Sequence, residues 1–420
     1  MSFSALLGAV FFCAIGPATA SQIPGPDLQG VSESAPLRAA IDRAVETHPS
    51  IAAAKAQARA AGAEVRAAKW QKFPTFSVEG LLLDQRGNRT QAQAVVDQPL
   101  WTGGRISGAI GRARARQDAA AAAFDEAVLS IALSTAQAFF EVHRWHERVA
   151  ILSLSLEQHR RMVETMERRY AQEVSPLSDL ELARSRALQI EQQIYQARSQ
   201  EAAASSRLRE LVGDPFYVAG TLPPVPRDWP RFDDGAITAQ ALGYSPQLKR
   251  LRFEAEAAGA DARIARASVL PQLSGQYSYN DVSGHRVGLV LKAQSDGGLS
   301  RFAAAEAARS REEASELQAV ATERQLRDQL FALLRDYESA TSRLGGSTAA
   351  STSAQRVMES YMRQFTSGRR TWLDVMNAVR ETTTAQIDAM EVRISGQSSL
   401  ARILLLSGQW GPIKEEAMPS

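Results

Sequence analysis

The most constraining feature of this 420-residue sequence is that it repeats itself at a nearly constant offset. Pro246 follows Pro49 by 197 residues (246 − 49), and Pro271 follows Pro74 by the same 197 (271 − 74). Offsets of 194 or 195 residues relate Gly103-Gly104 to Gly297-Gly298, Tyr170 to Phe365, Asp179 to Asp374, and 211–213 to 406–408. A period this long exceeds that of solenoid repeats, so the pattern indicates a duplicated half.

Each half predicts the same order of elements, beginning with an alanine-rich helix and two strands. The first helices are expected over 50–72 and 246–268, because alanine is the best helix former and each segment ends before a proline. Strict alternation of side chains over 272–280 is typical of a strand with two different faces. The strands are expected at about 74–84, 91–101, 271–280 and 286–294. Their length of about 9–11 residues suits a tilted membrane-crossing strand.

A very long helix follows each strand pair. No glycine or proline occurs from Arg112 to Ser175, which predicts a helix of roughly 95 Å at about 1.5 Å per residue. Apolar residues at alternating steps of three and four indicate a coiled-coil seam; they are Val142, Trp145, Val149, Leu152, Leu156, His159, Val163, Met166 and Tyr170, with His159 as the polar member. Pro176 and Gly368 break the two long helices, and second helices are expected over 177–212 and 371–406. Gly345-Gly346 predicts a local irregularity or bend in the second long helix.

The N-terminus and composition restrict the location of the chain. Residues 1–20 resemble a signal peptide, with an apolar run from Ala5 to Ile15 and a small-x-small site ending at Ala20. Cys13, the only cysteine, lies in that run, so the mature chain is expected to have no disulfide. No later stretch is expected to form a membrane-spanning helix, so contact with a bilayer is expected through a β-barrel. The net charge of +2 and scattered arginines argue against a nucleic-acid partner.

These boundaries predict a mainly α chain with membrane β-strands and an internal two-fold repeat. The expected segments are the signal peptide 1–20, a first repeat 36–213, a linker 214–235, a second repeat 236–408 and a tail 409–420. Four strands cannot close a membrane barrel, since the smallest have about eight. Two, three or four copies would supply about 8, 12 or 16 strands, and the residues alone do not choose among them.

Two stretches stand out beside the duplication: Gln98-Pro99-Leu100-Trp101-Thr102-Gly103-Gly104-Arg105, and the break from Arg169-Tyr170 to Ser178-Asp179-Leu180. Both resemble the TolC family of outer-membrane efflux and secretion channels, in a likeness that runs from about Leu37 to Gly408. The resemblance implies a homotrimer with a 12-stranded barrel, an equatorial belt and a long α-helical tunnel. It also implies an outer-membrane location in a Gram-negative bacterium, contact with outer-membrane lipid, and docking to an inner-membrane ABC or RND transporter through a periplasmic adaptor (membrane fusion protein).

The same resemblance assigns a periplasmic gate to the helix breaks. The segment 365–374 is similar to the family's constriction. By this resemblance Arg370 is the gating cation, Asp374 belongs to a ring of acids, and Asp179 with Ser178 is the partner from the first half. A ring of carboxylates at a constriction favours cations.

The sequence departs from the family pattern at two gate positions. Phe365 stands where the family has an aromatic hydroxyl, so one hydrogen bond is expected to be missing. Asn377 stands where the family has a second acid, which weakens the expected ring. An alternative role for Asp179 and Asp374 is capping of the helices that begin after the breaks.

No catalytic, cofactor or metal site is predicted, so the chain is not expected to be an enzyme. His143 and His146 are three residues apart on a helix but lack the pattern of a zinc protease. The leading hypothesis is a passive export duct, and the resemblance of Gln98–Arg105 favours type I protein secretion over multidrug or small-molecule efflux. A periplasmic coiled-coil scaffold or adaptor remains the alternative of another class.

Overall fold

The computed structural model describes residues 35–83, 89–213, 229–280, 284–293 and 299–410. The expected signal peptide with Cys13, most of the linker, Gly297-Gly298 and the tail beyond Trp410 lie outside the described residues. Each half contains two helices, two strands and two helices, in that order. The first half comprises α2 (Ala35–Thr47), α3 (Pro49–Trp70), β1 (Thr75–Leu83), β2 (Arg89–Trp101), α4 (Arg105–Ala171) and α5 (Leu177–Val212). The second comprises α6 (Asp234–Tyr244), α7 (Pro246–Ala267), β3 (Gln272–Asn280), β4 (Gly284–Lys292), α8 (Ser300–Thr366) and α9 (Trp372–Leu406).

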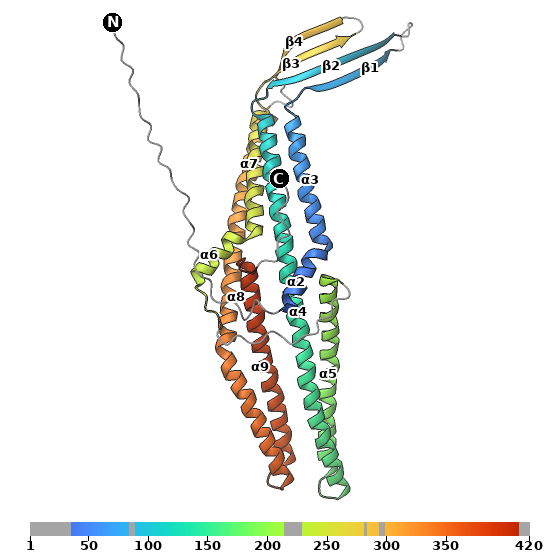
Figure 1. Cartoon of the computed structure of the whole chain (residues 1–420), viewed down its shortest axis with the longest axis vertical. Coiled ribbons are helices and arrows are strands. Elements are labelled where there is room, and N and C mark those ends of the chain that lie inside the picture. Colours follow the sequence, from blue (N-terminus) through green and yellow to red (C-terminus); the bar gives the residue numbers. More distant parts are fainter. Residues whose placement is uncertain (1–34, 84–88, 214–228, 281–283, 294–298, 411–420) are drawn as a thin grey trace, which may run out of the picture.

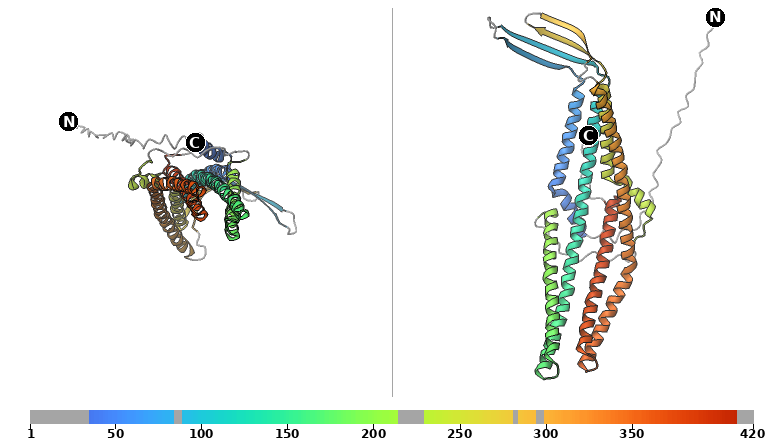
Figure 2. Two further views of the ribbon diagram at one scale, coloured as in Figure 1. Left: turned by 90° about the horizontal axis from the view of Figure 1, so that it is seen from below. Right: turned by 180° about the vertical axis from the view of Figure 1, so that it is seen from behind.

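The molecule is elongated, with the strands at one end and both helix breaks at the other (Figure 1). The two longest helices, α4 and α8, have 67 residues each, or about 100 Å at 1.5 Å per residue. Helices α3 and α7 lie beside them near the sheet, and α5 and α9 lie beside them near the breaks (Figure 1). Seen from below in Figure 2, the helices form a curved layer. The predicted fold class is confirmed for the single chain.

Most of the coiled-coil seam predicted on α4 faces its neighbouring helices, although its last member, Tyr170, is 44% exposed. Leu152, His159 and Met166 are buried, and Trp145 and Val149 pack against the cluster around Leu152. The ring nitrogen Nδ1 of His159 lies 2.7 Å from the carbonyl oxygen of Ser155 one turn earlier, which satisfies the polar member of the seam. A polar group buried with a hydrogen-bond partner avoids the cost of an unsatisfied one.

The structure corrects three details of the sequence reading. Helix α4 begins at Arg105, earlier than the expected Arg112, and the short helices α2 and α6 were not predicted as elements. Helix α8 is helical throughout, so the irregularity expected at Gly345-Gly346 does not interrupt it, and a bend there stays a prediction. A Cβ atom at either of these two glycines would have open space around it, so packing within the chain does not require them.

The sequence was expected to contain no segment like a membrane-spanning helix after residue 20. This expectation is wrong, because one helix is long and apolar enough by length and composition. Helix α4 contains an 18-residue window with a mean hydropathy of 1.3 and few charged residues. The window is apolar because this part of α4 is rich in alanine, which counts as apolar but serves close helix packing. One third of that window is buried inside the chain, and α4 as a whole packs against α2, α3, α5, α7 and α9.

The largest hydrophobic core lies near the middle of the molecule. It is formed where α2 packs on α4 and α5, and where α9 packs on α8. Its most buried side chains include Leu37, Ile41, Phe139, Ile394 and Leu400. This core joins the two halves far from both the sheet and the helix breaks.

The four strands form one antiparallel sheet in the order β1-β2-β3-β4. The register aligns apolar side chains on one face, with Phe76 opposite Val96, Val96 opposite Tyr277, and Tyr277 opposite Val287. The other face is mostly polar, although Val95 and Val290 also lie on it. On it, Ser274 Oγ donates to Asp97 Oδ2 at 3.1 Å, and Lys292 lies 3.5 Å from the same carboxylate oxygen.

Candidate functional site

The two helix breaks form matching turns at the end of the molecule opposite the sheet (Figure 1). In the first turn the amide of Val174 donates to the carbonyl of Arg169 at 2.8 Å. In the second the amide of Arg369 donates to the carbonyl of Gln364 at 2.9 Å. These residues are 195 apart (364 − 169 and 369 − 174), so the duplication extends to the backbone hydrogen bonds of the turns.

Each turn also contains one residue in the left-handed region at an equivalent position. Gly368 has φ 74° and Glu173 has φ 59°. Within the described residues, Glu173 is the one residue other than glycine with a positive φ. A side chain in this region clashes with the backbone, so the first turn carries strain that the second avoids.

Asp374 caps the helix that follows the second turn. The amide of Asp374 donates to Thr371 Oγ1 at 3.2 Å, and the amide of Thr371 donates to Asp374 Oδ2 at 3.2 Å. This reciprocal pair is a capping box. Hydrogen bonds from the Thr371 hydroxyl and amide, followed by the charge of Arg370, lower the pKa of Asp374. The carboxylate of Asp374 therefore caps α9, which is the alternative role expected from the sequence.

Asp179 occupies the equivalent place in the first half but makes a different contact. Pro176 stands where the second half has Thr371, and proline has neither a hydroxyl nor an amide hydrogen to complete a capping box. The carboxylate of Asp179 instead accepts a hydrogen bond from Nε1 of Trp372 at 2.9 Å. This bond connects the first turns of α5 and α9 and therefore the two halves.

Arg370 makes its described contacts within the second half. Its Nε donates to Gln364 Oε1 at 3.3 Å, and its guanidinium carbon lies 4.4 Å from the ring centre of Tyr361. In the first turn Arg169 Nε donates to Ser175 Oγ at 3.0 Å. Arg169 corresponds to Gln364, and Ser175 to Arg370, at the offset of 195. A side-chain hydrogen bond between the same two positions thus spans both turns. The arginine stands before the turn in the first half and after it in the second.

Phe365 supports a second contact between the halves, although it lacks a hydroxyl group. The guanidinium carbon of Arg169 lies 5.7 Å from the ring centre of Phe365, within the range of a cation–π interaction. Ser178 and Asn377 are exposed at the same end of the molecule. The structure thus gathers all six predicted gate residues at one tip, and their gating roles remain predictions.

An apolar cluster lies directly behind these polar contacts and also combines both halves. Its buried members are Met162, Met166, Leu180, Ala183, Met358, Val375, Met376, Ala378 and Val379. The tip is therefore one packed unit in which polar residues cover a shared core.

Three residues that hold the tip together were not predicted from the sequence. Trp372 donates a hydrogen bond to Asp179, and Arg169 lies over the ring of Phe365. The ring of Tyr361 lies against the guanidinium of Arg370. An available signal was the enrichment of aromatic and arginine side chains on both sides of each break, since these pair through cation–π contacts.

The described residues show no arrangement suited to metal chemistry. Among them, no group of three or more His, Cys, Asp or Glu side chains could hold a metal ion. His143 is buried and packs on Phe139, with ring centres 4.5 Å apart. His146 points elsewhere and lies 2.8 Å from a carboxylate oxygen of Glu201.

Comparison with known proteins identifies a family for the first half. Residues 40–214 match the family model described as "Outer membrane efflux protein". No curated protein sequence matches the chain. The matched segment contains the first helix break, with Arg169 and Asp179.

Solved structures extend the similarity to nearly the whole chain. The outer membrane protein VceC from Vibrio cholerae superposes with a TM-score of 0.76 at 19% identity, covering 89% of this chain and 96% of that one. The CmeC outer membrane channel from Campylobacter jejuni gives a TM-score of 0.78 at 15% identity, covering 91% and 87%. The open state of the MtrE outer membrane channel from Neisseria gonorrhoeae gives 0.72 at 16% identity, covering 89% of each chain. The first half therefore matches the outer membrane efflux protein family, and both halves together share the fold of solved outer membrane channels.

Proposed function

We propose that three copies of this chain form an outer-membrane duct that passes cargo from an inner-membrane transporter and a periplasmic adaptor to the cell exterior. The observation that carries the proposal is the sheet, which has one apolar and one mostly polar face. Apolar side chains such as Phe76, Val287 and Leu289 are 70%, 84% and 72% exposed. Exposed apolar side chains in register on one face are expected of a barrel wall that contacts lipid, with the polar face lining water.

The edges of the sheet support association between copies. Within the described residues, β1 and β4 each pair on one side only. Unpaired edges are unstable in a membrane, because their amide and carbonyl groups find no water there. Pairing β4 of one copy with β1 of the next closes the wall, and three copies of four strands supply the 12 strands expected from the family resemblance.

The helical tip supports a gate at the other end of the duct. Polar bonds and the shared apolar cluster hold α4 and α5 against α8 and α9. Opening a passage at this end requires the two helix pairs to move apart, and the contacts of Asp179 and Phe365 oppose that movement. Asp374 stabilises the start of α9 and can still present its charge, because its side chain is 39% exposed.

The cargo of this duct is either small molecules or secreted proteins. The family description names efflux, which supports small molecules as the cargo. Type I protein secretion is the second candidate, and it rests on the resemblance of Gln98–Arg105. Deleting the gene and measuring both drug sensitivity and the secreted proteins distinguishes them: raised sensitivity with unchanged secretion supports efflux, and the reverse supports secretion.

Planar-bilayer recording of the purified protein tests the duct itself. We expect discrete conductance steps from detergent-purified protein, together with heat-modifiable migration of a trimer. A protein that is soluble without detergent and never conducts, even after Asp179 and Arg370 are both neutralised, would support the periplasmic scaffold and overturn the proposal.

A further inference from the structure

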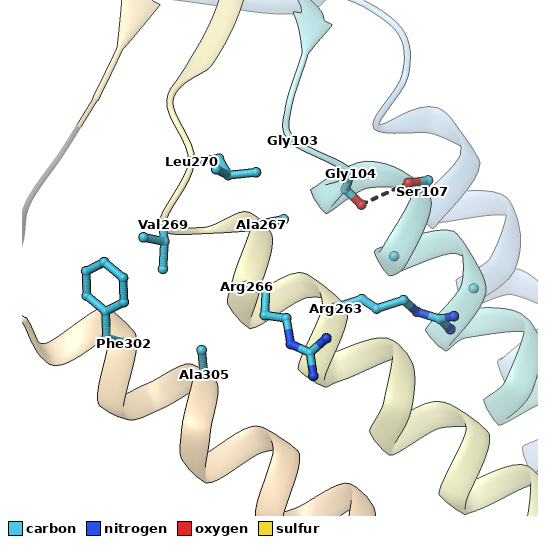
Figure 3. Close-up of a pocket in the computed structure, with 12 residues that line it drawn as sticks. Gly103, Gly104, Ser107, Arg263, Arg266, Ala267, Val269, Leu270, Phe302 and Ala305 are labelled. Carbon is cyan, nitrogen blue, oxygen red and sulfur yellow. Dashed lines mark hydrogen bonds between the residues drawn. The ribbon is translucent and has the colours of Figure 1, made fainter.

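A cleft of about 820 Å³ lies where the helices meet the sheet (Figure 3). It is bounded by the start of α4, the end of α7 and the start of α8. The lining residues are Gly103, Gly104, Ser107, Gly108, Gly111, Arg263, Arg266, Ala267, Val269, Leu270, Phe302 and Ala305. Its volume is in the range of sites that accept small molecules or headgroups.

Two arginines line the lower part of the cleft. Arg263 and Arg266 project from α7 and are exposed (Figure 3). Within the part of the chain that the structure describes, neither forms an ion pair. A nearby arginine behaves differently, because Arg112 lies 3.0 Å from the carboxylate of Asp261. The cleft therefore presents two guanidinium groups that form no ion pair with the described residues.

The part of the cleft nearer the sheet is apolar. Val269 and Leu270 lie toward the strands, with Phe302 facing them from α8 (Figure 3). Leu270 and Phe302 are 45% and 58% exposed in the chain. The start of α4 adds the positive end of a helix dipole at Gly104. A ligand that matches this surface has an anionic group on the helix side and hydrocarbon on the sheet side.

The first half repeats the basic pair at an equivalent position. Arg66 and Lys69 on α3 precede Arg263 and Arg266 by 197 residues (263 − 66 and 266 − 69). Both are exposed and form no ion pair with the described residues. Trp70 and Phe73 follow them, 67% and 54% exposed, with ring centres 4.9 Å apart. Basic residues beside exposed aromatic rings are typical of a membrane interface.

We propose that this cleft, which includes Arg263 and Arg266, binds the phosphate of an anionic phospholipid whose acyl chains contact Leu270 and Phe302. The inference rests on the proposed function, because a sheet in the outer membrane brings the cleft to the headgroup level of its periplasmic leaflet. Guanidinium groups form paired hydrogen bonds with phosphate, and apolar contact with acyl chains distinguishes a lipid from a soluble anion.

Native mass spectrometry of the detergent-solubilised full-length protein tests this proposal. Phosphatidylglycerol and phosphatidylethanolamine of matched chain length are titrated separately, and apparent dissociation constants are compared. We expect tighter binding of phosphatidylglycerol. The double variant R263Q/R266Q should weaken that binding about 25-fold, since each basic residue near the membrane surface contributes about fivefold. Equal affinity for the two lipids, or unchanged binding by R263Q/R266Q, overturns the proposal.

Three controls separate the alternatives. R263K/R266K keeps both charges and should retain the preference, whereas R356Q/R380Q removes two exposed charges far from the sheet and should leave binding unchanged. Glycerol 3-phosphate should not compete, because it has no acyl chains; competition equal to that of the lipid would show a soluble-anion site and overturn the lipid assignment.

Conductance distinguishes failure of this inference from failure of the proposed function. R263Q/R266Q should conduct like the unaltered protein. Conductance without any lipid preference refutes the lipid site alone, whereas no conductance from the unaltered protein refutes the duct on which this inference rests.

Discussion

The indole Nε1 of Trp372 donates a 2.9 Å hydrogen bond to Oδ2 of Asp179, and this bond ties the start of α9 to the start of α5. The two residues are 193 positions apart and come from different halves of the duplication. Asp179 and Asp374 occupy matched positions, yet one joins the halves and the other caps its own helix. Proline at position 176 explains the difference, because it prevents a capping box in the first half.

Replacing Trp372 by phenylalanine should loosen the tip. The change keeps an aromatic ring but removes the donor to Asp179, and a hydrogen bond of this kind contributes about 1 kcal/mol. We expect the open population in planar-bilayer recordings to rise by about fivefold, which corresponds to that free energy. Asp179→Asn is the matched control, because its amide oxygen can still accept from the indole. Equal gating by Trp372→Phe and the unaltered protein would show that the bond does not restrain opening.

Substitutions at the two turn positions with positive φ should have opposite effects on the stability of their turns. Glu173→Gly relieves backbone strain and should stabilise the first turn by about 0.5–1 kcal/mol, after the greater freedom of glycine in the unfolded chain is included. Gly368→Ala should destabilise the second turn by about 1 kcal/mol. No atom lies within 4 Å of the added Cβ, so this cost arises from the backbone alone.

Hydrogen exchange measures these local changes. Protection of the amides of Val174 and Arg369, which close the two turns, should rise in Glu173→Gly and fall in Gly368→Ala, respectively. Changes of the same sign in both variants would contradict the strain argument.

His143 should make the stability of the helical body depend on pH. Burial, opposed in part by the charge of Glu147 and reinforced by His146 and Arg393, lowers the pKa of His143 to about 4 from its ordinary value of 6.5. The neutral ring is therefore favoured in the folded chain. Its contribution is present above pH 6.5 and is lost as the pH falls toward 4, by up to about 3 kcal/mol per protomer.

Thermal unfolding followed by circular dichroism between pH 7 and pH 4 checks this expectation. His143→Leu removes the titrating group from an apolar site and should flatten the decline. His146→Leu is the control, since that side chain is 71% exposed on the same helix. A pH profile unaltered by His143→Leu would assign the decline to other groups.

Arginine at adjacent positions of β4 should distinguish the two faces of the sheet. Leu289 belongs to the apolar row, and Val290 belongs to the opposite face with Lys292. Leu289→Arg should reduce assembled, heat-modifiable trimer in the membrane, because an arginine facing lipid costs about 2–4 kcal/mol. Val290→Arg should assemble nearly normally. The reverse order would place lipid on the other face.

Much of the fold could be predicted because its determinants are local. The proline and glycine positions define the duplication and the helix breaks, and α5 begins at Leu177 and ends at Val212 as expected. Alternation over Gln272–Asn280 identified β3 within one residue of its observed start. The membrane-helix expectation was wrong because alanine in α4 raises hydropathy, although its role there is packing between helices.

The residues of the tip were predicted by position, but their partners were not. The sequence determined that Asp179 and Asp374 each follow a break, because a break and a helix start depend on neighbouring residues. Only the tertiary structure decided that Asp179 meets Trp372 and that Arg169 lies over Phe365. Such contacts depend on how four helices from both halves pack around a shared core. The spacing of residues along the chain does not reveal which side chains of the two halves meet there.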